Sequence, residues 1–433
     1  MSTFRNLLVI CTLLFQQLAG YPQGKTDPVL QSILSANKNS LLQEVLRNGD
    51  TYRCQVIYTR IDRDKNNLPH FTNFYFNYNP LLYFNPASTV KMPLAFLSLE
   101  KLHLLAKPGV DKYTFLQIDS SYPGQKSLYR DSTAEKGLPS IAHFIKKAFL
   151  VSDNDAYNRM YQFVGQQEIN RILHAKGYRD VRITRQFMGF TPQQNRHTNQ
   201  FRFIDKNGDV IYTQKAAFNT DSFYFPHVVK IGNGYMDRND SLIKEPIDFT
   251  QHNNLSLLDL QRMLQSVLFP ASLPSRQRFK ISGEDRQFLL QYLSQFPSET
   301  NYPKYDSSKY FDSYVKFFFR DTGRKMPPNV RVFNKVGWAY GFMTDVSYVA
   351  DFTNNIEFML AATLYVNSDG ILNDNKYDYD SKGYPFMYQL GQTIYQYEMN
   401  RQRQFKPDLS GFKIQYDHRD KTDTRPTIRE VDN

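Results

Sequence analysis

The chain reads Tyr83-Phe84-Asn85-Pro86-Ala87-Ser88-Thr89-Val90-Lys91 where a predicted helix begins, and this helix runs from about Ser88 to Leu105. A serine three residues before a lysine on a helix places both side chains on one face. There the lysine amine can take the serine proton, or support another base that does. Pro86 favours a helix start here, and the positive end of the helix dipole favours a developing alkoxide. The segment therefore predicts a nucleophile, Ser88, with Lys91 beside it.

A serine three residues before a lysine occurs too often in this chain to identify a catalytic pair by itself. It also occurs at Ser35–Lys38, Ser241–Lys244 and Ser313–Lys316. A solvated helix face is the ordinary explanation of such a pair, so the context has to distinguish Ser88.

Two further motifs supply that context. Ser152-Asp153-Asn154 opens a predicted helix 64 residues after Ser88 (152 − 88), although Ser and Asp are also ordinary helix caps. Lys335-Val336-Gly337 ends a predicted strand and precedes Trp338, although a simple hairpin would explain it equally well.

Taken in order, the three motifs resemble the penicillin-recognising serine enzymes, above all class A β-lactamases. The signature of that family is S-x-x-K, then S-D-N, then K-T-G or K-S-G. The resemblance covers residues 28–405 and extends beyond the motifs into 83–91 and 150–156. It implies an α/β (α+β) fold of two lobes. An antiparallel sheet from both chain ends is flanked by helices, and a helical lobe is inserted between its halves.

The resemblance implies three catalytic residues. Ser88 would attack a carbonyl and form an acyl-enzyme, Lys91 would assist its deprotonation, and Ser152 would relay a proton to the leaving nitrogen. No metal and no cofactor is implied. The substrate would be a β-lactam or a related small-molecule or peptide-like amide or ester.

The resemblance also implies a set of substrate-binding residues: Asn154, Lys335, Gly337 and Trp338. Asn154 would hydrogen-bond the substrate, and Lys335 of the K-V-G motif would attract an anionic substrate group. The backbone N–H groups of Ser88 and Trp338 would form the oxyanion hole.

The sequence departs from the family in two places. In class A enzymes a loop glutamate activates the deacylating water, but no carboxylate occurs here between Asp180 and Asp205. An acyl-enzyme would then persist, as in penicillin-binding proteins, unless His197 or a residue from elsewhere replaces the base. Val336 stands where the family has Thr or Ser, so the hydroxyl that helps bind a substrate carboxylate is lost.

Three functional hypotheses follow. The first is a β-lactamase-like serine hydrolase. The second is a penicillin-binding-type carboxypeptidase or transpeptidase acting on cell-wall peptide, favoured by the missing glutamate. The third is a non-catalytic binding protein on the same fold, which the retention of Ser88, Lys91, Ser152 and Asn154 opposes.

The N-terminus predicts export. Arg5 precedes an apolar run over residues 7–15, and the small residues Ala19 and Gly20 follow, which is the layout of a signal peptide over residues 1–20. We therefore expect a periplasmic or secreted protein without a membrane span. Cys54 is then the only cysteine of the mature chain, which excludes an intramolecular disulfide and a cysteine metal site.

Composition and charge bear on two further classes of protein, disordered chains and nucleic-acid-binding proteins. A hydrophobic fraction of 41% in 433 residues provides for a large core and excludes global disorder. The net charge of +11 comes from scattered Lys and Arg with no basic run interleaved with aromatics, so we expect no nucleic-acid partner.

Periodicity predicts the order of the elements. An amphipathic helix is expected over 28–47, strands over 52–61 and 71–78, and helices through the middle of the chain. Strands over 330–335, 344–351 and 356–366 and a helix over 384–401 close the pattern. Extra length near 195–248 and 299–330 predicts either a lid or substrate groove, or plain surface elaboration. A polar tail over 407–433 is expected to be extended or disordered.

Overall fold

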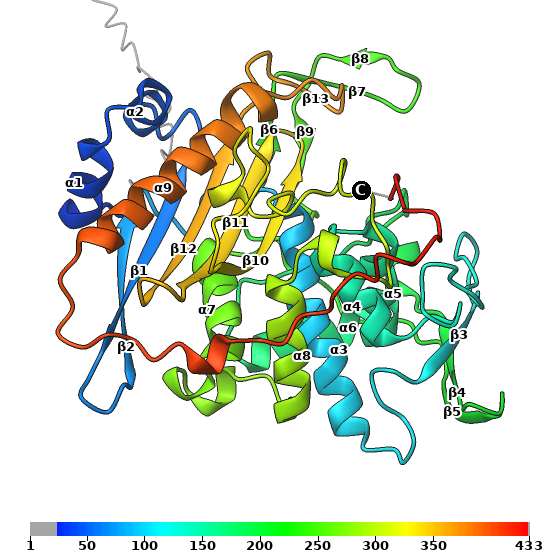
Figure 1. Ribbon diagram of the computed structural model, residues 1–433. Coiled ribbons are helices and arrows are strands. Elements are labelled where there is room, and N and C mark those ends of the chain that lie inside the picture. Colours follow the sequence, from blue (N-terminus) through cyan, green and yellow to red (C-terminus); the bar gives the residue numbers. More distant parts are fainter. Residues whose placement is uncertain (1–23, 432–433) are drawn as a thin grey trace, which may run out of the picture.

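The computed structural model describes residues 24–431, so the predicted signal peptide lies outside the described residues. The main sheet has five antiparallel strands in the order β10-β11-β12-β1-β2 (Figure 1). Strand β1 (Gln55–Arg63) pairs with β12, and this pairing joins the two ends of the chain. The other strands are β2 (Pro69–Phe76), β10 (Val330–Ala339), β11 (Phe342–Asp351) and β12 (Ile356–Tyr365). The predicted α/β fold, with a sheet from both ends, is confirmed.

Each face of the sheet is covered by helices because its strands are apolar on both sides. Val332 and Val336 of β10 belong to the core beneath α9 (Tyr384–Asn400), whereas Phe333 belongs to the core on the other side. This alternation follows from the period of two along a strand. Figure 1 shows α9 lying across one face, with α7 and α8 on the other. The remaining helices of these layers are α1 (Pro28–Ala36), α2 (Ser40–Arg47), α7 (Leu257–Leu268) and α8 (Gly283–Ser294).

The expected helix over 28–47 is two helices, and in this respect the prediction was wrong. Asn37 ends α1 in an extended conformation, and the Asn39 side chain caps α2 by accepting a hydrogen bond of 3.0 Å from the Leu42 N–H. Asparagine competes for backbone hydrogen bonds and therefore favours caps over helix interiors. The apolar period continues across the break because both helices pack on the same core.

The middle of the chain forms a helical lobe that carries two of the three motifs. Its helices are α3 (Lys91–Leu105), α4 (Ile141–Leu150), α5 (Asn154–Val164) and α6 (Gln166–Ala175). Helix α3 is apolar around most of its circumference and is buried from Lys91 to Glu100. A helix of this kind is a core helix, and its burial gives the first motif a rigid base.

The region 195–248 holds short strands that the sequence did not predict. Strands β3 (Phe115–Asp119), β4 (Gln200–Ile204) and β5 (Val210–Gln214) form one antiparallel sheet. Further short strands pair nearby: β6 (Lys230–Ile231) with β9 (Ile247–Asp248), and β7 (Gly234–Met236) with β8 (Leu242–Ile243) and β13 (Ile371–Leu372). These strands are two to five residues long, which leaves little periodicity to read.

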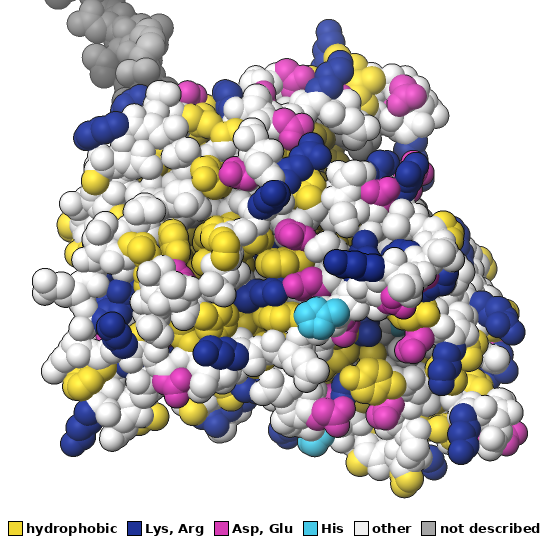
Figure 2. Space-filling model, in the orientation of Figure 1, with side chains coloured by type: hydrophobic (Ala, Val, Ile, Leu, Met, Phe, Trp, Pro, Cys, Tyr) yellow, Lys and Arg dark blue, Asp and Glu magenta, His cyan; other side chains and the backbone are white. Residues whose placement is uncertain are grey.

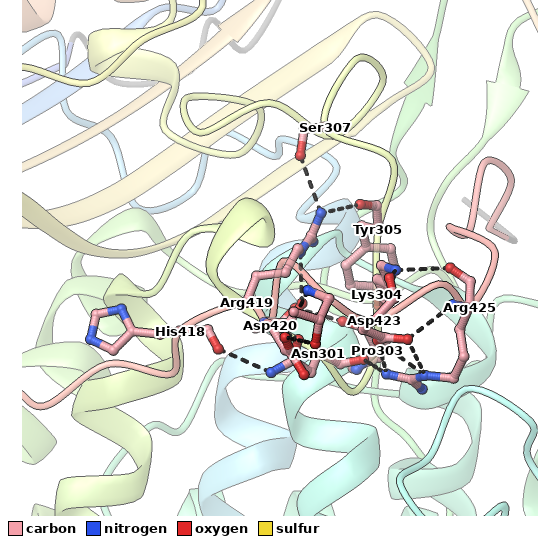
Figure 3. A network of polar contacts seen from close by, with 12 residues as sticks. Asn301, Pro303, Lys304, Tyr305, Ser307, His418, Arg419, Asp420, Asp423 and Arg425 are labelled. Atoms are coloured by element: carbon pink, nitrogen blue, oxygen red, sulfur yellow. Dashed lines mark hydrogen bonds and ion pairs between the residues drawn. The ribbon is translucent and has the colours of Figure 1, made fainter.

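The tail is extended along the helical side of the molecule and is held by polar contacts (Figures 1 and 3). The Arg419 guanidinium donates hydrogen bonds to the carbonyl oxygens of Pro297, Thr300 and Tyr305. Ile428 forms a bridge with Tyr305. The tail is thus paired with part of the region near 299–330, the second stretch of extra length. The domain limits of the sequence analysis stay predictions.

The surface is mixed in charge. On the face in Figure 2, Lys and Arg side chains lie scattered among Asp and Glu. Within residues 24–431, no helix is both long and apolar enough to cross a membrane.

Candidate active site

Ser88 lies in a short 3-10 turn, Ala87–Val90, that leads directly into α3. The turn is fixed on both sides of the serine. The Asn85 Oδ1 accepts a hydrogen bond of 2.9 Å from the Ala87 N–H, and the Thr89 hydroxyl donates one of 2.6 Å to the Pro86 carbonyl. Ala87 has φ of 42°, a strained value for a residue with a Cβ. Such strain persists only where the surroundings impose it, so the position of Ser88 is well determined.

Ser88 and Lys91 share a face, as the sequence predicts, because side chains three residues apart align in a 3-10 turn. Ser88 is half-buried and Lys91 is fully buried. Among residues 24–431, no side chain forms a hydrogen bond with the Ser88 hydroxyl. The Lys91 amine is directed instead to the second motif.

The Lys91 Nζ contacts three oxygens of the S-D-N motif. It donates hydrogen bonds to the Ser152 carbonyl and, over 2.8 Å, to the Asn154 Oδ1. The Ser152 Oγ lies 3.3 Å from the same nitrogen. The first and second motifs are therefore in direct contact.

The surroundings of Lys91 favour its neutral form. Burial lowers the pKa of the Lys91 amine well below its ordinary value, and the positive charge of Lys335 lowers it further. Asp153 opposes this only in part, because its carboxylate caps α5 at the Ala156 N–H and pairs with Lys147 at 3.3 Å. A neutral amine has a lone pair, which is what a proton acceptor needs.

The Ser152 hydroxyl bridges two lysines. The Lys335 Nζ donates a hydrogen bond of 2.9 Å to the Ser152 Oγ and another of 2.8 Å to the Val336 carbonyl. Ser152 has φ of 66°, so its backbone is strained in the same way as that of Ala87. The three predicted polar groups Lys91, Ser152 and Lys335 are brought together, and each is at most 2% exposed.

The ammonium group of Lys335 can lose its proton near neutral pH. Burial lowers the pKa of Lys335 to about 7, although the nearby Asp345 carboxylate raises it. The Asp345 carboxylate is itself buried and accepts hydrogen bonds from Asn334, Ser347 and the Phe317 N–H. Burial raises the pKa of Asp345 to about 6.

Gly337 allows β10 to touch the serine turn. A Cβ at this position would lie 2.6 Å from the Pro86 oxygen and 2.9 Å from the Ser88 nitrogen. Real Cβ atoms do not approach backbone so closely, so only glycine fits. The backbone of β10 at Gly337 and Trp338 thus lies beside the Ser88 N–H.

The side chains that flank Gly337 face the other way. Val336 is fully buried in the core beneath α9. The Trp338 ring packs edge-on against Tyr314 and Phe317. Val336 therefore contributes to the packing of the core and gives the site no polar group. Trp338 can contribute only its backbone to the site.

The loop after α6 brings an aromatic ring to Lys91. The Lys91 Nζ lies 5.3 Å from the centre of the Phe187 ring, which stacks on Tyr157 at 4.3 Å. The sequence shows that this loop lacks a carboxylate, but it does not predict the contact of Phe187 with Lys91, because the segment has no periodicity.

His197 lies in an aromatic stack. Its ring stacks on Tyr122 at 3.5 Å and contacts Phe218 at 4.6 Å. Its Nε2 is buried and has no hydrogen-bond partner among residues 24–431. As regards metals, no group of three or more His, Cys, Asp or Glu side chains within residues 24–431 is arranged to hold an ion.

Residues 40–211, which include the first two motifs, match the model of the β-lactamase enzyme family. The chain is β-lactamase-like. The resemblance inferred from the three motifs is confirmed, whereas the roles of the individual site residues stay predictions. No curated protein matches the chain.

Several solved structures are similar to this β-lactamase-like chain at low identity. A β-lactamase from Sphaerobacter thermophilus is 14% identical, with 83% of this chain and 97% of that chain covered and a TM-score of 0.43. A class A β-lactamase from Mycobacterium abscessus is 13% identical, covering 82% and 96%, with a TM-score of 0.43. The TLA-1 extended-spectrum β-lactamase is 14% identical, covering 86% and 99%, with a TM-score of 0.47.

Proposed function

We propose that this protein is an exported β-lactamase-like serine hydrolase that forms an acyl-enzyme through Ser88 and hydrolyses a β-lactam or a related amide or ester. The observation that carries the proposal is the buried contact series Lys91 Nζ, Ser152 Oγ and Lys335 Nζ beside Ser88. The export rests on the predicted signal peptide.

In the acylation step, the Ser88 oxygen attacks the substrate carbonyl while its proton passes to the neutral Lys91 amine. A bond forms between the Ser88 Oγ and the carbonyl carbon, and the carbonyl oxygen becomes an oxyanion. The N–H groups of Ser88 and Trp338 stabilise it, and each donor of this type contributes about 3 kcal/mol. Preorganised donors of this kind need little rearrangement during the reaction.

Collapse of this intermediate breaks the carbon–nitrogen bond of the substrate. The Ser152 hydroxyl gives its proton to the leaving nitrogen and regains one from Lys91, which returns to its neutral form. The positive charge of Lys335 stabilises the negative charge that develops on the Ser152 oxygen as its proton leaves. It also attracts an anionic substrate group, and Asn154 orients the substrate amide.

Deacylation requires a water and a base. The loop places the Phe187 ring beside Lys91, and no carboxylate occurs between Asp180 and Asp205. This contact favours a second candidate function, a penicillin-binding-type carboxypeptidase or transpeptidase with a long-lived acyl-enzyme. The chemistry of acylation is the same in both.

Mass spectrometry of the intact mature chain after incubation with a penicillin tests the proposal, with Ser88→Ala as control. Hydrolysed drug with wild type, and none with the control, would support the hydrolase. A stable adduct on wild type alone would support Ser88 as nucleophile with slow deacylation, and release of D-alanine from cell-wall peptides would then favour the second candidate. Intact drug and no adduct would exclude β-lactams as substrates.

A further inference from the structure

A cavity of about 610 Å³ lies on the side of the 184–190 loop that carries Arg185 and Phe190. Its volume is in the range of cavities that bind small molecules. The lining combines cationic and aromatic side chains, chiefly Arg185, Arg196, His252, Phe190, Phe223 and Phe225. None of these residues belongs to the S-x-x-K, S-D-N or K-V-G motifs.

The two arginines of the lining have hydrogen-bond partners other than carboxylates. Arg185 donates to the His252 Nε2, and Arg196 donates to the carbonyl oxygens of Asn219 and Asp221. In the described part of the chain, neither guanidinium pairs with a carboxylate, and the same is true of Arg182, which lies over the Phe225 ring. The Nε of Arg182 is buried without a hydrogen-bond partner. Half-buried guanidinium groups without carboxylates favour an external anion.

Two other charged or titratable groups line the cavity. Asp248 is exposed, and its carboxylate accepts a hydrogen bond of 2.8 Å from the Thr250 N–H. Burial and the charge of Arg185 lower the pKa of His252 to about 3, so His252 is neutral at physiological pH. Because Arg185 and Arg196 are positively charged and Asp248 is negatively charged, the lining of the cavity carries a net positive charge.

The aromatic rings provide an apolar wall beside these charges. The Arg196 guanidinium lies 5.9 Å from the centre of the Phe223 ring, and Arg182 lies 6.0 Å from that of Phe225. Tyr224 between them is 81% exposed. An exposed aromatic segment next to unpaired guanidinium groups suits a ligand with one anionic end and one planar or apolar part.

The wall of the cavity is rigid because three asparagines hold the loop. The Asn253 Oδ1 accepts hydrogen bonds from the N–H groups of Thr184 and Arg185. Asn195 binds the N–H of Gln186 over 2.7 Å, and Asn158 binds that of Phe187 over 2.8 Å. Four consecutive N–H groups are thus fixed, so the cavity is formed before any ligand binds. The same loop carries Phe187 to Lys91.

We propose that this cavity is a binding site for a small anion, a carboxylate or phosphate attached to an aromatic or otherwise apolar group. The anionic end lies between Arg185 and Arg196, and the apolar part lies against Phe223 and Phe225. Its lining contains no residue of the three motifs, so the proposal does not depend on the proposed hydrolase function. A ligand there would contact Arg185, two residues from the ring beside Lys91.

Isothermal titration of the mature chain with phenyl phosphate, benzoate, inorganic phosphate and benzyl alcohol tests the proposal. We expect phenyl phosphate or benzoate to bind at least tenfold more tightly than benzyl alcohol, and the better of the two identifies the anion. Arg185→Gln should weaken that binding tenfold or more. Phe225→Leu should weaken phenyl phosphate but leave inorganic phosphate unchanged, so it tests the apolar wall if Arg185→Gln does not fold.

Two control variants separate this site from general charge and from the catalytic site. Arg47→Gln removes the same charge at the exposed end of α2 and should leave the affinity unchanged. Lys335→Gln should also leave it unchanged. Equal binding of all four probes, or loss of binding in Lys335→Gln with full binding in Arg185→Gln, would overturn the proposal.

Discussion

The Nζ of Lys91 lies 3.3 Å from the Oγ of Ser152, and both groups are buried. A hydroxyl can donate to a neutral amine and accept from an ammonium group at the same time. Because Lys335 donates to the same hydroxyl, the arrangement suits a neutral Lys91 and a charged Lys335. If both lysines were charged, the hydroxyl would lie between two ammonium donors, and the charge of Lys335 accordingly lowers the pKa of Lys91.

Lys91→Met should slow acylation by penicillin about 10²–10⁴-fold, the usual contribution of a positioned acid–base group. The chain should stay folded. The variant removes the hydrogen bond that the Ser152 carbonyl accepts from Lys91, at a cost of about 1–3 kcal/mol, but it also removes a buried amine. The time course of the adduct by mass spectrometry measures the effect, and circular dichroism checks the fold.

Lys38→Met is the matched control, since Lys38 belongs to another S-x-x-K pattern and is exposed at the end of α1. Its acylation rate should equal that of wild type. Full activity in Lys91→Met would show that another group accepts the serine proton.

The rate of acylation should pass through a maximum with pH. On the acid side it rises as Lys91 loses its proton, and the lowered pKa places this rise well below pH 10. On the alkaline side it falls above about pH 7 as Lys335 loses its charge. Stopped-flow acylation with a chromogenic cephalosporin measures both limbs.

Lys335→Arg isolates the alkaline limb because a guanidinium stays charged throughout this range. The variant should lose the fall above pH 7 and keep the rise on the acid side. An unchanged alkaline limb would assign that limb to a group other than Lys335.

The parts of the site that could be predicted from the sequence are those fixed by local geometry. Ser88 and Lys91 share a turn, and Ser152 and Asn154 share a helix start, so their spacing alone places them together. The alternation of Val332, Phe333 and Val336 likewise follows from the strand period. Periodicity does not show that these two motifs lie in the same site. That prediction came from the resemblance to the family.

The parts that could not be predicted depend on tertiary contacts between irregular segments. Phe187 reaches Lys91 because Asn158 fixes its backbone, and no period in the sequence reports such a contact. The break between α1 and α2 depends on two asparagines inside a continuous apolar pattern. In both cases a side-chain amide decides the path of the backbone.

Gly337→Ala should impair acylation strongly, although it adds only one methyl group. The new methyl group would lie 2.6 Å from the Pro86 oxygen and 2.9 Å from the nitrogens of Ser88 and Thr89, all of them backbone atoms. Either β10 or the serine turn has to move, and we expect acylation to fall at least 100-fold. Overpacking of this kind costs about 1–3 kcal/mol of stability.

Gly283→Ala is the control for this glycine substitution, since within residues 24–431 no atom outside the adjoining backbone of α8 lies within 4 Å of the added methyl group. At the start of α8 it should leave acylation unchanged and the stability equal or slightly higher. Acylation at the wild-type rate in Gly337→Ala would show that the approach of β10 to Ser88 does not matter for the reaction.

The tail should contribute to stability through Arg419. Its guanidinium donates to three carbonyl oxygens of the 297–305 segment, at 2.6 Å to Pro297, 3.0 Å to Thr300 and 2.9 Å to Tyr305 (Figure 3). Arg419→Ala leaves these partly buried acceptors without their donor, and we expect the free energy of unfolding to fall by about 1–3 kcal/mol. Urea unfolding followed by circular dichroism measures this.

The same substitution should loosen the segment next to the S-D-N motif. Asp153, Tyr305 and Ile428 line one cavity of about 230 Å³, so the tail and the start of α5 share a surface. Hydrogen exchange should therefore rise over residues 300–306 and 419–431 in Arg419→Ala, and change little in the main sheet. Lys421→Ala, an exposed position in the same tail, should match wild type in both measurements. Equal exchange and equal stability in the two variants would mean that the tail is held by its apolar contacts, such as Phe412 against Phe333 and Tyr348, rather than by Arg419.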